Sequence, residues 1–418
     1  MADSPKTVID VTNSPKGLGW MRAVSMIVMG CVGVGILALP RTAAFAGWLA
    51  ALLGLIFAGL VNLYNNIILW RTLFLTAQGE DRVARSYEHA VRSTFGVGGS
   101  IYSGIIVHVL LISVCVAMLI LMGSTTEAMT RVLNRQAWIA LWTLVGIPFS
   151  WIKEVKDVGF IAVFGVTSAS AMVIVIIVAS ADRMVTDGIS ESLAVVPSDA
   201  LEFIAALASY FYVYSFTAAS PTICYHMTKP ENFPKTVVVA TIFITLLYSS
   251  VMELGYVGYG QFIATVDTIV DAISPPGQTL DVFGWLINIT VLAVMLPHYL
   301  VQFTPTAKQI DRMSSHIGER KGWSTKRCKV TALVCRTLLV IAEGGLAIVI
   351  PKVSSIVSLI GAFCSTQVTI LFPIACYMKV KRQHQLPWPL WEILVHALFT
   401  MVAFVIMGIG IYGAIIHF

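Results

Sequence analysis

The most constraining feature of this chain is a series of long apolar stretches, most of them near the roughly 20 residues that cross a bilayer as a helix. Eleven such stretches are present. They cover approximately residues 20–46, 48–75, 99–131, 136–151, 158–180, 201–226, 235–259, 280–306, 329–350, 353–378 and 390–416. Because lipid offers no partners to free backbone groups, stretches of this length must be helical. The sequence therefore predicts an all-α integral membrane protein with 11 transmembrane helices.

The composition excludes several classes of protein. Hydrophobic residues make up 57% of the chain and charged residues 12%, against roughly 25% charged residues in a soluble domain. So few charges cannot cover soluble domains, which excludes a soluble enzyme, a secreted disulfide scaffold and a nucleic-acid-binding protein. No CxxC or HExxH motif is present, so the sequence predicts neither a metal site nor an enzyme.

The distribution of Lys and Arg predicts the orientation in the membrane. If the N-terminus is cytoplasmic, the inner loops hold 20 of the 27 Lys and Arg residues and the outer loops hold 5. Because positive residues concentrate on the cytoplasmic side, we expect a cytoplasmic N-terminus and a C-terminus on the opposite side. We expect residues 1–19 to form a short cytoplasmic tail and residues 20–418 a single transmembrane transporter domain. We expect the protein to lie in the plasma membrane rather than in a vacuolar or lysosomal membrane.

The first apolar stretch contains a segment that is a poor helix interior. Three glycines fall within six residues, and each costs about 1 kcal/mol relative to alanine inside a helix. An unwound segment in a bilayer leaves backbone groups unsatisfied unless they line a cavity or bind a ligand. We therefore predict a break here whose residues bind substrate. The candidates are Gly30, Cys31, Gly33, Val34 and Gly35.

The sixth apolar stretch contains a second such segment. Residues 210–221 are rich in aromatic, Ser and Thr side chains and end at Pro221, which lacks a backbone donor and disfavours the preceding helical turn. Two of the tyrosines lie four residues apart, on one helical face, where they could wall a pocket or simply pack. The candidate substrate-binding residues are Tyr210, Tyr214, Ser215, Phe216 and Thr217.

Breaks in the first and sixth helices predict two halves of five helices with a binding site between them. The N-terminus of a half-helix offers free N–H groups to a carboxylate, and its C-terminus offers carbonyl oxygens to an ammonium group or a cation. This chemistry fits a zwitterion such as an amino acid. The alternative interpretation is that the glycines only permit close helix packing.

The motifs around both breaks resemble those of the amino acid/auxin permease family, within the amino acid–polyamine–organocation superfamily. GVGILALP at 33–40 is similar to the family's first-span signature, and residues 214–235 are similar to its sixth span and the following loop, including KPENFP at 229–234. The resemblance covers the chain from about Gly17 to Tyr412. It implies a LeuT-type five-plus-five inverted repeat plus one extra helix. It also implies transport of amino acids or auxin, usually with protons and in some branches with sodium.

Two departures from the family pattern affect substrate identity. Ser215 and Phe216 stand where the family often has Gly-Gly, and the Phe216 ring fills space that a larger substrate would use. Val34 stands where members often carry Ser or Thr, so a hydroxyl is lost from the first break. We therefore expect a substrate with a small or medium side chain and do not predict which one.

Polar residues inside spans are costly and are candidates for ion coupling. The candidates are Glu253, His298 and Asn288. An apolar environment favours a neutral carboxylic acid, and histidine titrates near neutral pH, so the first two suit a proton carrier. Glu343 and His108 are also embedded, and for all of these groups the alternative is neutral hydrogen-bonded packing. A sodium site needs oxygen ligands, and the eighth span offers no Ser/Thr pair at mid-span, so H⁺ is expected and Na⁺ stays open.

These observations predict a secondary active amino acid transporter, most simply a proton-coupled symporter with alternating access around the two breaks. We expect no cofactor beyond the coupling ion. The expected partners are a small-molecule amino acid, the coupling ion and membrane lipid, with no nucleic acid. Two alternatives stay open: a sodium-coupled amino acid transporter, and a membrane sensor that binds an amino acid without net transport.

Overall fold

The computed structural model describes residues 18–77, 83–84, 86–151, 158–189, 193–197 and 199–416. Within these residues all regular elements are helices, and the only β feature is an isolated bridge between Leu18 and Met227. The all-α class is therefore confirmed. The predicted tail at 1–19 lies outside the described residues except for its last two positions.

Eight helical segments in the described residues are long and apolar enough to cross a membrane. They are α3 (Trp48–Leu75), α4 (Tyr87–Thr130), α6 (Val158–Asp187), α9 (Phe233–Tyr259), α12 (Val282–Lys321), α13 (Thr325–Val349), α16 (Leu390–Ile416) and the segment Val353–Gln383. That last segment comprises α14 (Val353–Ile360), the π-helical η4 (Gly361–Ser365) and η5 (Gln367–Leu371), and α15 (Phe372–Gln383). A ninth span is the pair α1 (Trp20–Cys31) and α2 (Val34–Ala46), which is bent by 60°.

Two of the eleven predicted spans correspond to shorter helices. The fourth is α5 (Arg135–Ser150), with 16 residues. The sixth is divided into α7 (Ala200–Val213), the 3₁₀ segment η2 (Ser215–Ala218) and α8 (Ser220–His226). Helices thus occupy all eleven predicted ranges, but length and composition support eight or nine crossings. The number eleven stays a prediction.

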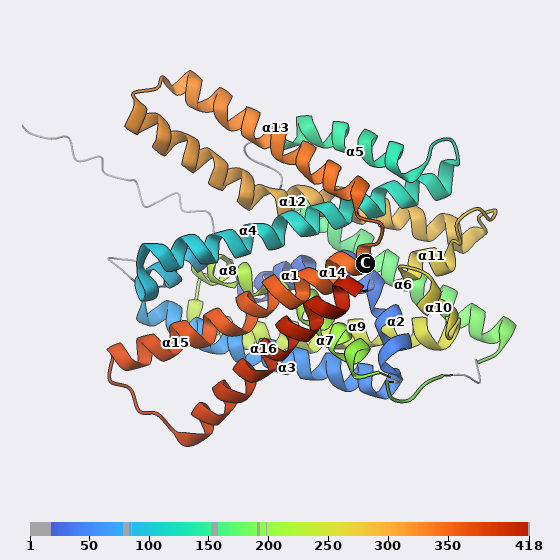
Figure 1. Cartoon of the computed structure of the whole chain (residues 1–418), viewed down its shortest axis with the longest axis horizontal. Helices are drawn as coiled ribbons and strands as arrows, with labels where there is room; N and C mark the ends of the chain where they lie inside the picture. The colour runs from blue at the N-terminus through green and yellow to red at the C-terminus, as the bar shows by residue number, and fades with distance from the viewer. Residues whose placement is uncertain are drawn as a thin grey trace, which may run out of the picture.

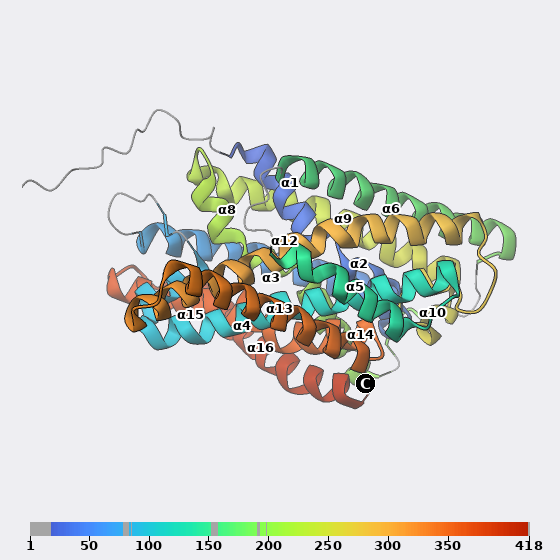
Figure 2. The same cartoon turned by 90° about the horizontal axis from the view of Figure 1, so that it is seen from above.

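The long helices run along the horizontal axis of Figure 1, and Figure 2 shows α6 on one flank and α16 on the opposite flank. α9 packs on α1, α2, α3 and α6, while α12 packs on α4, α6 and α13, and α13 packs on α5. The two broken segments therefore belong to a group built around α3 and α9, next to a second group built from α4, α5, α12 and α13. Short helices α10 (Phe262–Thr265) and α11 (Ile269–Ile273) join α9 to α12.

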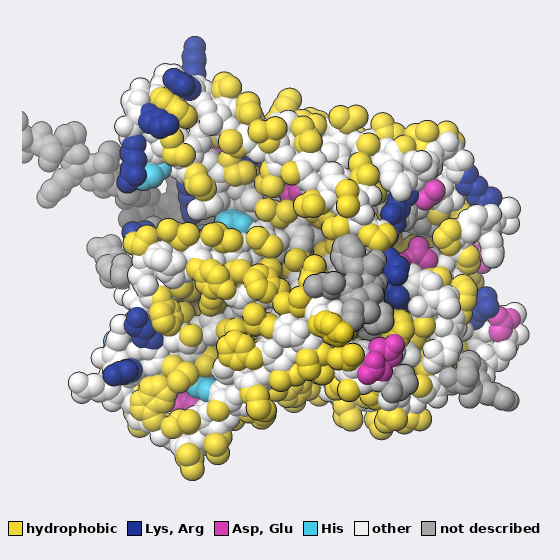
Figure 3. Space-filling model, viewed as in Figure 1, with side chains coloured by type: hydrophobic (Ala, Val, Ile, Leu, Met, Phe, Trp, Pro, Cys, Tyr) yellow, Lys and Arg dark blue, Asp and Glu magenta, His cyan; other side chains and the backbone are white. Residues whose placement is uncertain are grey.

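The surface of the molecule is that of a membrane protein. Figure 3 shows hydrophobic side chains covering the middle of the visible face, with many Lys and Arg side chains at its left end, further ones in its right half, and Asp and Glu mostly in its right half. Large apolar side chains such as Leu246, Leu338 and Phe404 are exposed on α9, α13 and α16. Because such a belt is stable only in contact with lipid, the chain is an integral, multi-pass membrane protein.

Candidate functional site

The first helix is interrupted immediately after Cys31. Val32 is extended (φ −76°, ψ 92°), and α2 begins at Val34 without a side-chain cap on its N-terminus. Glycine at 33 permits a close approach of α12, because a Cβ there would lie 2.8 Å from Cε1 of His298. The uncapped start of α2 leaves backbone N–H groups without side-chain partners, as the binding hypothesis requires.

The sixth helix is interrupted between Val213 and Ser220. Its 3₁₀ segment spans Ser215–Ala218, and Pro221 sits in the first turn of α8. Pro221 is therefore accommodated as a helix-starting residue, where its missing N–H costs nothing. This differs from the reason given by sequence, in which Pro221 disrupts the preceding turn.

The two breaks pack directly on each other. A Cβ at Gly35 would lie 2.5 Å from Cγ1 of Val213 and 3.3 Å from the ring of Tyr212. The hydroxyl of Tyr248, from α9, lies 2.7 Å from the Cys31 carbonyl oxygen and 3.1 Å from that of Val213. A single buried hydroxyl therefore bridges the C-terminal carbonyl of α1 and that of α7.

The second break is held by asparagines of α3. Nδ2 of Asn62 donates to the Tyr214 carbonyl oxygen (2.7 Å), and Nδ2 of Asn66 donates to Oγ1 of Thr217 (3.0 Å). Oγ of Ser220 donates to Oδ1 of Asn66 at 2.6 Å. These buried amides satisfy polar groups that the broken helix leaves free, which is the condition for irregular backbone in a membrane.

Sequence reasoning missed these asparagines, although a signal was present. Asn62, Asn65 and Asn66 follow the i, i+3, i+4 pattern of one helical face inside an otherwise apolar span. Embedded amides must find partners, and a polar face on α3 could have indicated an irregular segment opposite it. Tyr248 gave no comparable signal, because one tyrosine in an apolar span is ordinary.

A third irregular segment lies beside the second break. Two consecutive π-helical segments, η4 and η5, occur where α14 leads into α15, and π-helical turns are frequent at functional sites. Oγ of Ser215 donates to Oγ of Ser365 at 2.8 Å. Ser365, Thr366 and Thr369 are all fully buried. This polar stretch, also missed by sequence, extends the candidate site to the tenth predicted span.

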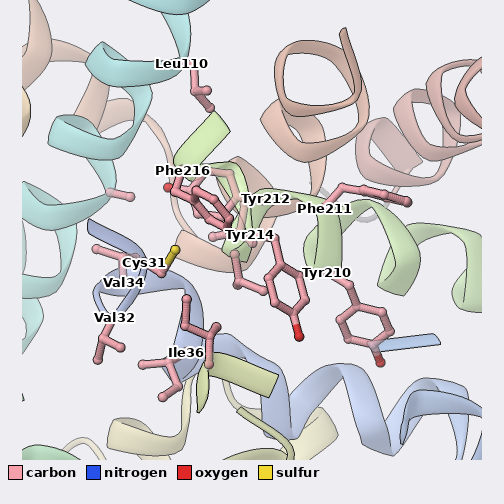
Figure 4. Close-up of a cluster of buried hydrophobic side chains, with 14 of the residues drawn as sticks. Cys31, Val32, Val34, Ile36, Leu110, Tyr210, Phe211, Tyr212, Tyr214 and Phe216 are labelled. Carbon is pink, nitrogen blue, oxygen red and sulfur yellow. The ribbon is translucent and has the colours of Figure 1, made fainter. Parts of the chain in front are cut away.

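The predicted substrate-binding residues are mostly brought together. Figure 4 shows Cys31, Val34, Tyr214 and Phe216 from the two breaks close to one another, with the Cys31 sulfur pointing toward Phe216. The contacts described above place four more predicted residues in the region where the two breaks meet: Gly33, Gly35, Ser215 and Thr217. Two residues do not join it. Gly30 is exposed on α1, and Tyr210 packs by its ring against Gly54 of α3.

The three ion-coupling candidates lie in different places. His298 touches the first break at Gly33, approaches Nε2 of Gln302 to 3.0 Å, and borders a cavity of about 10 Å³ between α1, α6 and α12. Asn288 lies ten residues earlier on α12, about 15 Å away along the helix, and donates to Ser274 (2.9 Å). Glu253 lies on α9, and its Oε1 is buried without a partner among the described residues. The structure thus brings one candidate to the break.

Two further embedded groups each make one hydrogen bond to another helix, while Oε1 of Glu343 and Nε2 of His108 are buried without a hydrogen-bond partner among the described residues. Tyr299 donates from α12 to Glu343 on α13 at 2.6 Å, and the Glu343 side chain is fully buried. Nδ1 of His108 lies 3.1 Å from Oγ1 of Thr306. Both pairs join helices of the group formed by α4, α5, α12 and α13, away from the two breaks.

Opposite the basic end, a charged cluster joins the second half of the broken helix to α14. Arg41 lies 2.5 Å from Oγ of Ser354 and 3.5 Å from the Asp267 carboxylate. Asp267 also accepts from the backbone N–H of Val353 at 2.6 Å. On α11 nearby, burial and the Asp267 charge raise the pKa of Asp271 to about 6. This cluster ties α2, α14 and the α10–α11 connection together at one end.

No cluster of three or more metal-ligating side chains occurs in the described part of the chain. The polar groups at the breaks are amides, hydroxyls, backbone groups and one imidazole. Such groups suit binding and orientation of a small polar molecule.

Comparisons with known proteins agree with this architecture. The solved structure of MhsT in complex with L-phenylalanine superposes with a TM-score of 0.59, covering 96% of this chain and 100% of that one at 14% identity. At that identity the match shows a shared LeuT-type fold.

Relatives by sequence are plant proteins. Amino acid transporter AVT1C of Arabidopsis thaliana is 25% identical over 398 residues, covering 92% of this chain and 67% of that protein. AVT1E covers 84% and 64% at 22% identity, and AVT1J covers 99% and 94% at 23%. The chain thus spans about two thirds of the length of the first two. The family described as "Transmembrane amino acid transporter protein" matches residues 16–416, and the chain belongs to this family.

Proposed function

We propose that the protein carries α-amino acids across a membrane by alternating access around the two breaks, driven by proton symport. The observation that carries the proposal is the direct apposition of two interrupted helices at Gly35 and Val213, whose neighbouring carbonyls share the Tyr248 hydroxyl. The uncapped N-terminus of α2 would receive the substrate carboxylate. The C-terminal carbonyls of α1 and α7 would receive the ammonium group.

The side-chain pocket would lie beside Phe216. Figure 4 shows its ring among Cys31, Tyr212 and Tyr214, and only 4% of Phe216 is exposed. Because this volume is occupied by a bulky ring, the site would favour amino acids with small or medium side chains. Replacement of Phe216 by a smaller residue should then admit larger substrates.

Proton coupling is supported by the residue that faces the first break. A sodium ion at this junction would need oxygen ligands from the first break and from the helix opposite. Here α12 presents the imidazole of His298 to Val32 and Gly33. An imidazole can bind and release a proton, but its nitrogens are poor ligands for a hard cation. His298 is therefore the first candidate for the coupling proton, ahead of Glu253 and Asn288.

The cluster at Arg41 would close the site from the outer side. It connects α2, which belongs to the broken helix, with Ser354 of α14 and Asp267 of the α10–α11 region. Outward opening would separate these groups. By the Lys/Arg distribution this end is extracellular in a plasma membrane, with the N-terminus cytoplasmic and the C-terminus outside.

The test is uptake of pooled radiolabelled amino acids into proteoliposomes under an inward proton gradient or an inward sodium gradient. We expect saturable accumulation under the proton gradient alone. Accumulation only with sodium would overturn the ion assignment, and binding without uptake under either gradient would overturn transport in favour of a sensor. Uptake that never saturates would indicate a channel.

A further inference from the structure

The helical hairpin at the basic end of the molecule projects beyond the length of a membrane span. α12 has 40 residues, or about 60 Å, against a hydrocarbon thickness of about 30 Å. Figure 1 shows the α12–α13 turn at the upper left of the molecule, on the outer edge of the bundle. The hairpin is therefore available to the membrane interface rather than buried in the bundle.

The end of this hairpin is a defined structure. Oγ of Ser314 on α12 donates to the Cys328 carbonyl oxygen of α13 at 2.7 Å. α12 ends at Gly322 in a left-handed conformation (φ 64°), and Ser324 caps α13 by accepting from the N–H of Arg327. The apolar surface of α13 begins at exposed Val330. The contact between Ser314 and Cys328 thus lies close to the level where lipid headgroups meet the hydrocarbon.

The hairpin concentrates the positive charge of the chain. Residues 308–329, here called the basic hairpin, contain seven Lys and Arg residues and two acidic residues. Their excess of five equals the net charge of +5 of the whole chain. All seven are exposed, and they are Lys308, Arg312, Arg320, Lys321, Lys326, Arg327 and Lys329.

These cations are not neutralised within the described residues. The ion pairs found there use Arg41, His108, Arg183, Arg336 and Lys381. Asp311, one of the two acids of the basic hairpin, is paired with Arg336. Arg336 is itself tied to the Ser150 carbonyl oxygen of α5 at 2.9 Å. Among the described residues these seven cations therefore have no acidic partner, and the base of the hairpin is fixed to the bundle.

Three of the seven cations, together with a histidine, are arranged along one side of α12. Lys308, Arg312, His316 and Arg320 follow each other at intervals of four residues, which places them in one stripe on a helix. Exposed Met313 and Ile317 lie in the adjacent stripe. At the turn, the guanidinium of Arg327 lies 4.5 Å from the ring centre of Trp323. Basic and apolar stripes with a tryptophan at their end are typical of surfaces that lie at the lipid headgroups.

We propose that the basic hairpin binds the headgroups of anionic phospholipids in the leaflet at this end of the molecule. Phosphate-bearing lipids carry the complementary charge, and the hairpin continues two membrane-spanning helices, which hold it at headgroup level. An acidic protein segment could also bind the cations. It would not explain why the apolar side chains of Met313 and Ile317 lie beside them, at the level where lipid supplies hydrocarbon. Because α12 also carries His298, a bound lipid would steady the helix that contacts the first break.

The test measures lipid selectivity of the full chain reconstituted in phosphatidylcholine vesicles. Trace spin-labelled phosphatidylserine or phosphatidylcholine is added, and electron paramagnetic resonance gives the motionally restricted fraction of each. We expect phosphatidylserine to be preferred about fivefold, the factor that about 1 kcal/mol per lipid contact provides. The preference should fall toward unity in 1 M salt, where the Debye length is about 3 Å. Equal restriction of both lipids at low salt would overturn the proposal.

A pair of matched variants locates the effect. The hairpin variant replaces Arg312, Arg320, Lys326 and Lys329 by Gln, and the control replaces Arg92, Lys229, Lys379 and Arg382, which are exposed basic residues outside the hairpin. Both remove four charges. We expect the hairpin variant alone to lose most of the phosphatidylserine preference. Equal losses in the two variants would show a diffuse charge effect and would contradict a site on the hairpin. The readout does not require transport, so it stands apart from the proposed function.

Discussion

The two breaks are stabilised in different ways. The second break is held from its own helix group by the amides of Asn62 and Asn66, which satisfy its carbonyl and hydroxyl groups. The first break has no such amides. Its geometry depends on the absence of a side chain at Gly33, against which His298 packs from the other helix group. The second break is thus held in one conformation by hydrogen bonds, whereas the conformation of the first break depends on the position of α12.

The largest effect should come from filling the contact at the first break. Gly33→Leu would drive a side chain into His298, since even a Cβ lies 2.8 Å from its ring, and overpacking costs roughly 1–3 kcal/mol. We expect amino acid uptake to fall to background while the protein still reaches the membrane. Gly30→Ala is the matched control because no atom lies within 4 Å of its added Cβ. Normal uptake by Gly33→Leu would show that the close approach has no role.

The next effect separates coupling from binding. His298→Gln keeps a polar side chain at the first break but removes the imidazole, the group there that can bind and release a proton. We expect proton-driven accumulation to drop at least about tenfold, with substrate exchange across equilibrated membranes retained. His108→Gln, which alters a histidine away from the breaks, should accumulate substrate normally. If His298→Gln still accumulates substrate with an unchanged pH profile, the proton is carried elsewhere.

A smaller effect is expected at the second break. Asn66→Ala removes the shorter hydrogen bonds of Thr217 and Ser220. Each hydroxyl then keeps one bond of 3.3 Å, to Asn62 and to Phe216 respectively, so we expect a loss of about 1 kcal/mol per bond. The melting temperature in detergent should fall, and the KM for the amino acid should rise. Asn65→Ala is the control, because among the described residues the amide of Asn65 bonds to the Val61 carbonyl in its own helix and to no other helix. If both variants lose melting temperature and substrate affinity to a similar extent, Asn66 does not act by supporting the second break.

The smallest effect lies outside both breaks, at the α11 connection. Because the pKa of Asp271 is raised to about 6, the folded protein holds a proton that the unfolded chain releases above about pH 4. Linkage then lowers stability as the pH rises from 4 to 6, by about 1–2 kcal/mol for this partly buried group. Melting curves should show this slope in the wild type, and Asp271→Asn should flatten it. An equal slope in the variant would assign it to other groups.

The same difference between the two breaks explains which features could be predicted from the sequence. Apolar length and the glycines at 30–35 are local signals. The apolar length correctly indicated the all-helical class, and the glycines predicted a break in the stretch where α1 ends at Cys31 and α2 begins at Val34. The supports of the second break, Asn66 and Tyr248, act on residues far away in the chain. Their role depends on which helices become neighbours, and a single sequence does not supply that. Likewise, Asn288 and His298 are both polar residues in the same apolar stretch. Of these two, His298 is the one that faces a break.

The most direct test of the central claim uses the cysteine that the chain already has at the first break. Cys31 is 8% exposed, and its sulfur points toward Phe216 of the second break. In a protein whose other cysteines are replaced by Ala or Ser, the rate of maleimide labelling of Cys31 would be measured with and without amino acids. If the breaks form the substrate site, transported amino acids will slow labelling at concentrations near their KM, and amino acids that are not transported will have no effect. Labelling that is indifferent to every transported amino acid would contradict the account.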